Sequence, residues 1–177
     1  MAKRIIAIGG EPASGKSTLM KYILKQYKPL KTFKYGLVRG LYNKENNLYF
    51  LGIYDNSVFC GTDKLSMAVQ PHFLKLIKEL PQATFVFEGD RLFNQSLFDK
   101  QECEIVVLNV TDQTKKERHE QRNDNQSDQF KRSKKTKIKN ILSKNKVTIL
   151  NNDTEKDNQE AKKTILNLIK CQTNPTL

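Results

Sequence analysis

The chain has no long apolar run, few cysteines and no cluster of histidines. No run of about eighteen apolar residues occurs, so we expect no membrane-spanning helix. The first predicted strand starts at Arg4, which leaves no room for a secretory signal peptide. The three cysteines are scattered and odd in number, and neither they nor His72 and His119 have the spacing of metal ligands. These absences predict a cytoplasmic protein with free thiols in a reducing compartment.

Two further absences narrow the class of protein. We find no internal repeat, and the sequence Asn-Lys-x-Asp, which usually reads guanine, does not occur. A chain of 177 residues is sufficient for one domain with one core. It is too short for a typical motor or helicase core. We therefore expect a single domain over residues 1–177.

Basic residues are abundant, and many of them lie in one segment. The chain has 31 Lys and Arg against 19 Asp and Glu, a formal charge of +12. Residues 131–146 contain eight basic residues and no acidic one. Such a segment attracts phosphate, either in nucleotides or in a nucleic-acid backbone. The alternative is a solvated helix face, and codon bias could explain part of the excess.

One motif carries specific chemistry. Residues 10–17 read Gly-Glu-Pro-Ala-Ser-Gly-Lys-Ser, which fits the phosphate-loop pattern G-x-x-x-x-G-K-[ST]. A β-branched run at 4–8 precedes the motif and a helical segment at 18–25 follows it, which is the context that this pattern requires. The glycines let consecutive N–H groups face an anion at the start of a helix. The expected nucleotide-binding residues are Gly10, Glu11, Pro12, Ala13, Ser14, Gly15, Lys16, Ser17 and Thr18.

Within the motif, two side chains have distinct expected roles. Lys16 would reach the β- and γ-phosphates, and the Ser17 hydroxyl would bind Mg²⁺. The expected cofactors are therefore ATP and Mg²⁺.

The rest of the chain predicts an α/β fold. Buried-type strands at 83–87, 104–110 and 147–150 alternate with helices near 73–80, 92–100, 112–122, 130–142 and 154–169. This alternation indicates a mostly parallel sheet covered by helices on both faces. Two extended stretches at 33–42 and 47–55 predict a β-hairpin, or two strands with an irregular link, at one edge of the sheet near an acceptor site. Polar residues 123–129 predict a hinge in a basic lid region over 112–140.

Several charged residues are candidates for chemistry. Glu88 and Asp90 follow a buried strand, where a carboxylate could support Mg²⁺ or activate an acceptor hydroxyl, although a strand-end acid can also serve solubility alone. Arg118 and Arg122 lie one helical turn apart and could meet charge on a transferring phosphoryl group. Asp63, Arg39 and Arg91 are candidate acceptor contacts. For Asp63 the alternative is a turn-former or helix cap, for Arg39 a surface arginine, and for Arg91 a pairing with Asp90.

The order of these features resembles the P-loop nucleoside and nucleotide kinase superfamily. Gly89-Asp90-Arg91 is similar to the acid-arginine motif after the third strand of thymidylate and deoxynucleoside kinases, where the arginine handles phosphate and the acid supports metal or acceptor. Here Leu92 replaces the usual third residue of that motif. Residues 59–69 and 88–93 also resemble kinases of tailed bacteriophages, one group of which phosphorylates 5-hydroxymethyluracil in DNA.

The resemblance implies a P-loop NTPase fold and an ATP-dependent kinase with a nucleotide-type acceptor, either a free nucleotide or a hydroxymethylated pyrimidine in DNA. Two alternatives stay open. One is a nucleic-acid-binding ATPase without an acceptor, and the other is a kinase of another small metabolite. In each case the expected partners are ATP and an anionic acceptor or nucleic acid, with no membrane.

Overall fold

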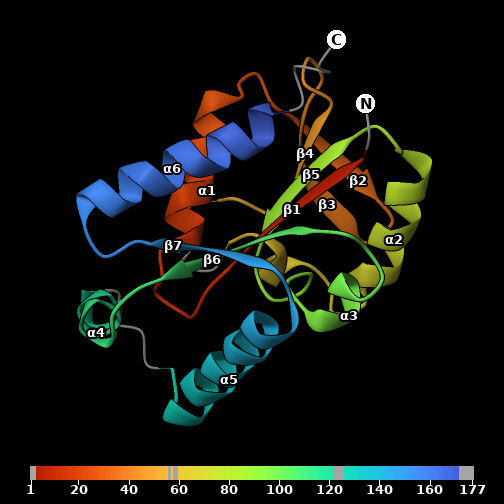
Figure 1. Cartoon of the computed structure of the whole chain (residues 1–177). Helices are drawn as coiled ribbons and strands as arrows, with labels where there is room; N and C mark the ends of the chain where they lie inside the picture. The colour runs from red at the N-terminus through yellow and green to blue at the C-terminus, as the bar shows by residue number, and fades with distance from the viewer. Residues whose placement is uncertain (1–2, 56, 58–59, 122–125, 172–177) are drawn as a thin grey trace.

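The computed structural model describes residues 3–55, 57, 60–121 and 126–171, which form one seven-stranded sheet with helices on both faces (Figure 1). The sheet order is β2-β3-β4-β5-β1-β6-β7. The strands are β1 (Arg4–Gly9), β2 (Lys31–Tyr35), β3 (Val38–Asn43), β4 (Leu48–Leu51), β5 (Thr84–Glu88), β6 (Glu104–Asn109) and β7 (Val147–Asn151). The helices are α1 (Lys16–Gln26), a 3₁₀ turn η1 (Thr62–Lys64), α2 (Val69–Glu79), α3 (Gln95–Phe98), α4 (Asp112–Gln121), α5 (Asp128–Lys144) and α6 (Glu155–Lys170).

The expected mostly parallel sheet is confirmed. β4, β5, β1, β6 and β7 run parallel, and β1 lies between β5 and β6. The central strands are apolar over nearly their whole length because helices cover both of their faces.

The edge of the sheet differs from the expected two-strand hairpin. The stretch at 33–42 is divided into β2 and β3 by a turn in which Gly36 has φ +55°. A second turn follows β3, where the Asn43 carboxamide accepts the backbone N–H of Asn46 at 2.9 Å. β4 then joins the parallel part beside β5. The prediction missed the first turn because the sequence around Gly36 contains no turn signal other than this one glycine.

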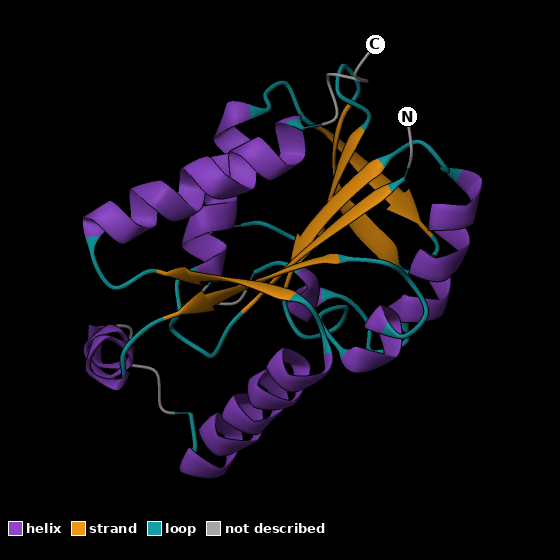
Figure 2. Cartoon of the chain, in the orientation of Figure 1, coloured by secondary structure: helices purple, strands orange, loops and turns teal. Residues whose placement is uncertain are grey.

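Two helical layers enclose the sheet (Figure 2). On one face, α1 and α6 pack against Ile6 and Ile8 of β1. On the other face, α2, α3 and α5 pack against Ile5, Ala7 and the phenylalanines of β5. α4 has no buried residue and lies to the side of both layers. No helix in the described part of the chain is long and apolar enough to cross a membrane.

Two helix boundaries differ from the prediction. α2 begins at Val69, so Pro71 lies in its first turn, where its missing N–H removes no hydrogen bond. α5 begins at Asp128, and the Ser127 hydroxyl caps it by accepting the N–H of Phe130 at 3.2 Å. The expected hinge is thus shorter at its C-terminal end, and its residues 123–125 lie outside the described residues.

The chain connections create a crevice at one edge of the sheet. β1 is followed by α1 on one face, whereas the neighbouring strand β5 leads to α3 on the other face. Where the connections of adjacent parallel strands diverge, a crevice forms outside their carboxyl ends, and ligands of open α/β sheets bind there. The predicted phosphate-binding loop follows β1, and Glu88 and Asp90 lie at the carboxyl end of β5, so both border this crevice.

Candidate functional site

The glycine-rich loop, residues 10–15, joins β1 to α1 through an irregular backbone. Gly10, Ala13 and Gly15 all have positive φ, at 145°, 64° and 93°. A Cβ on Gly10 would lie 2.6 Å from Ser14 Oγ and 2.7 Å from the carbonyl oxygen of Leu108. Only glycine fits at this position, because an added methyl group would contact backbone that cannot move away. The loop is therefore a tight curl at the positive end of α1.

Lys16 and Ser17, the first residues of α1, are directed toward this loop and toward β5. Lys16 Nζ donates to the carbonyl oxygens of Gly10 and Glu11, each at 3.0 Å. Ser17 Oγ donates to Glu88 Oε1 at 3.0 Å. The Ser17 hydroxyl and the Glu88 carboxylate are thus in contact, and the Lys16 side chain lines the same pocket.

Glu88 is the most buried acid of this group. It ends β5 and is 1% exposed. Burial raises the pKa of Glu88 to about 7; the nearby Asp63 and Asp90 add to this, while Lys16 and the Ser17 hydrogen bond oppose it. Gly61, with φ +76°, passes close to the carboxylate, since a Cβ there would lie 2.4 Å from Oε1. A carboxyl group held in this way exchanges its proton near neutral pH.

A pocket of about 110 Å³, here called the loop pocket, opens between the glycine-rich loop and the end of β5. Eight of the residues expected from sequence line it, namely Gly10, Pro12, Ala13, Lys16, Ser17, Asp63, Glu88 and Asp90. None of its other lining residues was predicted as a site residue, although Gly89 belongs to the acid-arginine motif; they are Cys60, Gly89, Gln126, Phe130 and Lys134. Among them, Phe130 is a large apolar side chain that is 40% exposed.

Two acids beside Glu88 have different partners. Asp63 Oδ1 accepts the backbone N–H of Asp90 at 2.7 Å, so Asp63 links its own loop to the end of β5 and caps no helix among the described residues. Burial and the neighbouring Asp90 raise the pKa of Asp63. Asp90 itself is paired with Lys134 and with Lys137, whose Nζ lies 3.0 Å from Oδ1. Burial alone would raise the pKa of Asp90, but the two lysines outweigh it and lower the value. Asp90 is therefore an ionised anchor for α5.

Other expected site residues lie outside the loop pocket. Glu11 is directed away from it and pairs with Lys115 at 3.0 Å. Thr18 is exposed on α1, whereas Ser14 is fully buried beneath the loop. Arg91 Nε donates to the carbonyl oxygen of Leu65 at 3.3 Å and lines no described pocket. The alternative, a pairing of Arg91 with Asp90, is absent from the described ion pairs, in which Asp90 is paired with Lys134 and Lys137.

Arg118 and Asn152 support the glycine-rich loop from outside. Arg118 donates to the carbonyl oxygens of Ala13 at 3.1 Å and Asn152 at 2.7 Å. The Asn152 side chain donates to the carbonyl oxygen of Ser14 at 2.7 Å and lies so close to Gly15 that a Cβ there would be 2.4 Å from Nδ2. Sequence reasoning missed Asn152, whose only signal is its position directly after a strand. Arg122, the second expected lid arginine, lies outside the described residues.

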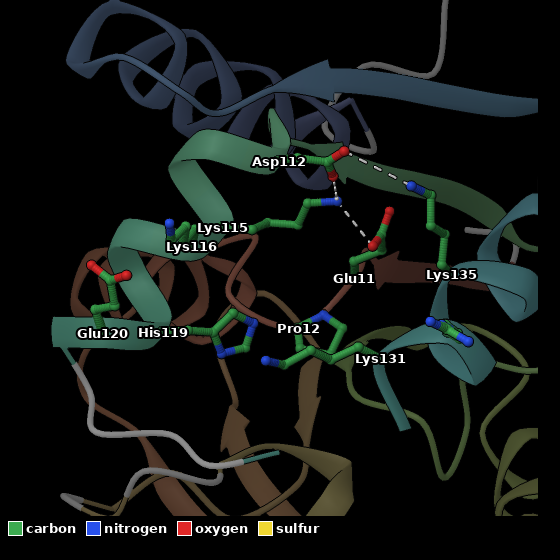
Figure 3. Close-up of a pocket in the computed structure, with 10 residues that line it drawn as sticks. Glu11, Pro12, Asp112, Lys115, Lys116, His119, Glu120, Lys131 and Lys135 are labelled. Atoms are coloured by element: carbon green, nitrogen blue, oxygen red, sulfur yellow. Dashed lines mark hydrogen bonds and ion pairs between the residues drawn. The ribbon is translucent and has the colours of Figure 1, made fainter. Parts of the chain in front are cut away.

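A larger pocket of about 690 Å³, here called the helix pocket, separates α4 from α5 next to the loop (Figure 3). Lys115 of α4 pairs with Glu11 of the glycine-rich loop at 3.0 Å and with Asp112 of its own helix at 2.6 Å. Asp112 also lies 4.0 Å from Lys135 of α5, which joins the two sides of the pocket. Its other lining residues include four that are basic, namely Lys116, Lys131, Arg132 and Lys135. Glu120 and His119 also line it. This part of the expected basic region is thus a hollow with cationic walls.

No family model matches the chain, and no curated protein matches it. Within the described ranges, no group of three or more His, Cys, Asp or Glu side chains could hold a metal ion by itself. The chemistry of the site must therefore be argued from its own residues.

Proposed function

We propose that this chain is a P-loop NTPase-fold kinase that transfers the γ-phosphoryl group of ATP to a hydroxyl group of a nucleotide-type acceptor. The observation that carries the proposal is the meeting of Lys16, Ser17 and Glu88 at the crevice between β1 and β5. The loop that supplies Lys16 and Ser17 has the phosphate-binding sequence, and the crevice is where α/β sheets bind ligands.

The donor side follows from the loop. Backbone N–H groups at the start of α1 would face the phosphates, aided by the helix dipole. Lys16 would exchange the carbonyl oxygens of Gly10 and Glu11 for the β- and γ-phosphate oxygens.

The residues also fit a Mg²⁺ ion. Mg²⁺ is usually held by one or two carboxylates together with water and substrate phosphates, so a set of three protein carboxylates is not required. Ser17 and Glu88 would hold it, and when bound it would neutralise charge on the phosphates. The buried position of Glu88 matches this role, because a neighbouring dication favours its ionised form.

The acceptor side involves Glu88 and Asp63. Either carboxylate could accept the proton of the acceptor hydroxyl as its oxygen bonds to the γ-phosphorus. The bond between that phosphorus and the bridging oxygen then breaks, and ADP leaves. Glu88, as a ligand of Mg²⁺, would stay ionised, so Asp63, whose pKa is raised by burial and by Asp90, fits the role of proton acceptor better. Asp90 fits this role less well, because Lys134 and Lys137 stabilise its ionised form.

The decisive experiment measures Mg·ATP binding and transfer of a γ-label from ATP. We expect Lys16→Ala to weaken Mg·ATP binding roughly 10- to 150-fold, since a hydrogen bond to a charged group contributes about 1.5–3 kcal/mol. Lys25→Ala, which removes an exposed lysine from the same helix, is the matched control. Near-normal phosphoryl transfer by Lys16→Ala would refute the assignment of this site.

A second candidate, a nucleic-acid-binding ATPase, is favoured by the cationic walls of the helix pocket. The label distinguishes the two. With nucleosides, nucleotides, and plain or hydroxymethylated DNA present, a kinase gives a labelled acceptor, whereas the ATPase releases only inorganic phosphate. A labelled sugar or other metabolite would instead identify a different acceptor class.

A further inference from the structure

A third pocket lies at the same edge of the sheet, on the side of the hairpins. This hairpin pocket has a volume of about 250 Å³ and is lined by Lys34, Gly36, Leu37, Arg39, Ile53, Lys64, Leu65 and Ser66. Three of these residues are cationic and none is acidic. It is therefore a basic hollow that is separate from both the loop pocket and the helix pocket.

Two of its cations face each other without compensation. Lys34 of β2 lies directly opposite Arg39 of β3 in the antiparallel register. Like charges at such cross-strand positions are destabilising. Neither side chain has an ion-pair partner in the part of the chain that the structure describes. The third cation, Lys64, shares its charge with the half-exposed carboxylate of Asp55. An incoming anion would remove this repulsion.

The pocket is held in shape before any ligand arrives. The turn between β2 and β3 packs against α2 so closely that a Cβ on Gly36 would lie 2.2 Å from Nδ1 of His72. Val38, the first residue after this turn, is fully buried. The backbone that carries Lys34 and Arg39 is thus fixed by packing, which lowers the cost of binding an anion.

The topology places this pocket beside the proposed transfer site. β4 runs parallel to β5, so the end of β2 and the start of β3 share the edge at which β5 ends in Glu88. β3 is two strands from β5, which corresponds to about 10 Å at the usual strand spacing. The chain also links the two pockets, because Asp63 lines the loop pocket while Lys64 and Leu65 line the hairpin pocket.

We propose that the hairpin pocket binds a phosphate dianion of the acceptor whose hydroxyl group is phosphorylated at the loop pocket. A guanidinium and two ammonium groups match the charge and the several oxygens of a phosphate better than those of a single carboxylate. This inference rests on the proposed function for its link to catalysis. Anion binding at the pocket can be tested separately.

The test is a titration with inorganic phosphate, followed by backbone amide NMR signals in a Lys16→Ala background, where the glycine-rich loop competes less for the anion. We expect saturable shifts at Lys34, Gly36, Arg39 and Lys64, with binding of acetate at least tenfold weaker. The double variant Lys34→Gln/Arg39→Gln should weaken phosphate binding at least tenfold.

Lys31→Gln is the matched control, because it removes one exposed lysine from the opposite end of the same strand. Its phosphate affinity should stay within twofold. Absence of shifts at the hairpin, equal binding of acetate, or equal loss in the control would each overturn the proposal. The amide spectrum also reports whether the double variant is folded, and Arg39→Gln alone replaces it if it is not.

A Mg·ATP titration separates this inference from the proposed function. The double variant with Lys16 intact should bind Mg·ATP as the wild type does. If the wild type fails to bind Mg·ATP while phosphate still binds at the hairpin, the kinase proposal fails and the anion site stands. If Mg·ATP binds but phosphate does not perturb the hairpin, the anion site fails and the kinase proposal stands.

Discussion

Burial of Glu88 should make the protein less stable as the pH rises from about 4.5 to about 7. The informative change is Glu88→Gln, which keeps the size and the ability to accept the Ser17 hydrogen bond but cannot ionise. In the wild type the folded-state pKa of Glu88 is about 7, against 4.5 for an unperturbed glutamate. Between these values the unfolded chain loses the proton first, so ionisation favours unfolding.

The size of the effect follows from the shift. Raising the pKa from 4.5 to about 7 corresponds, at about 1.4 kcal/mol per pH unit, to about 3 kcal/mol of unfolding free energy. Below pH 4.5 the carboxyl is protonated in both states and the term is absent. It grows as the pH rises and is complete above the folded-state pKa. Glu88→Gln should therefore gain about 3 kcal/mol relative to the wild type between pH 4.5 and pH 8.5.

Urea unfolding at a series of pH values, without Mg²⁺ or nucleotide, measures this difference. Taking the difference between variant and wild type cancels the titration of distant groups. Glu160→Gln, which changes an exposed acid on α6, provides the control and should run parallel to the wild type. If the Glu88→Gln curve also runs parallel from pH 5 to pH 8.5, the carboxyl of Glu88 does not have a raised pKa and the reasoning is wrong.

Two further predictions concern α5 and the helix pocket. Lys134→Gln/Lys137→Gln should raise the pKa of Asp90, measured by carbon NMR of its carboxyl group, and should lower stability by about 1 kcal/mol per pair; an unchanged Asp90 titration would contradict the pairing. If nucleic acid binds the helix pocket, Lys116→Gln/Arg132→Gln should reduce the slope of log K against log salt by about 2. The control for this salt dependence is Lys134→Gln/Lys137→Gln, which should change the slope less because those lysines already pair with Asp90. A protein without DNA affinity at low salt would exclude this use of the pocket.

Local patterns were sufficient to predict most of the fold. Continuous apolar runs such as Phe85–Phe87 indicated buried parallel strands, and the structure places them at the centre of the sheet. The helix predicted near 154–169 corresponds to α6, and the structure shows that a capping box of Thr154 and Asp157 begins it. The turn at Gly36 was missed because its stability comes from packing against His72, a contact between residues far apart in the sequence.

The site was predicted in part for the same reason. Ser17 and Glu88 follow strands that the sequence identifies, and neighbouring parallel strands bring their ends together. The roles of Lys134 and Asn152 were not predicted, because their main partners, Asp90 in one case and the glycine-rich loop in the other, are distant in sequence. The sequence predicted one role for the whole basic segment, either attraction of phosphate or a solvated helix face. The structure divides its lysines into those paired with Asp90 and those lining the helix pocket.

The ion pairs of Asp90 connect the position of a helix to the state of the loop pocket. Asp90 lines that pocket and also holds α5 through Lys134 and Lys137. A ligand that draws either lysine away from Asp90 must weaken the attachment of α5. Thermodynamic linkage makes this effect reciprocal. If docking of α5 changes the affinity of the ligand by some factor, binding of the ligand changes the docking equilibrium of α5 by the same factor. The docking of α5 and the ligand affinity of the loop pocket are thus linked by one coupling free energy, which can be measured from either side.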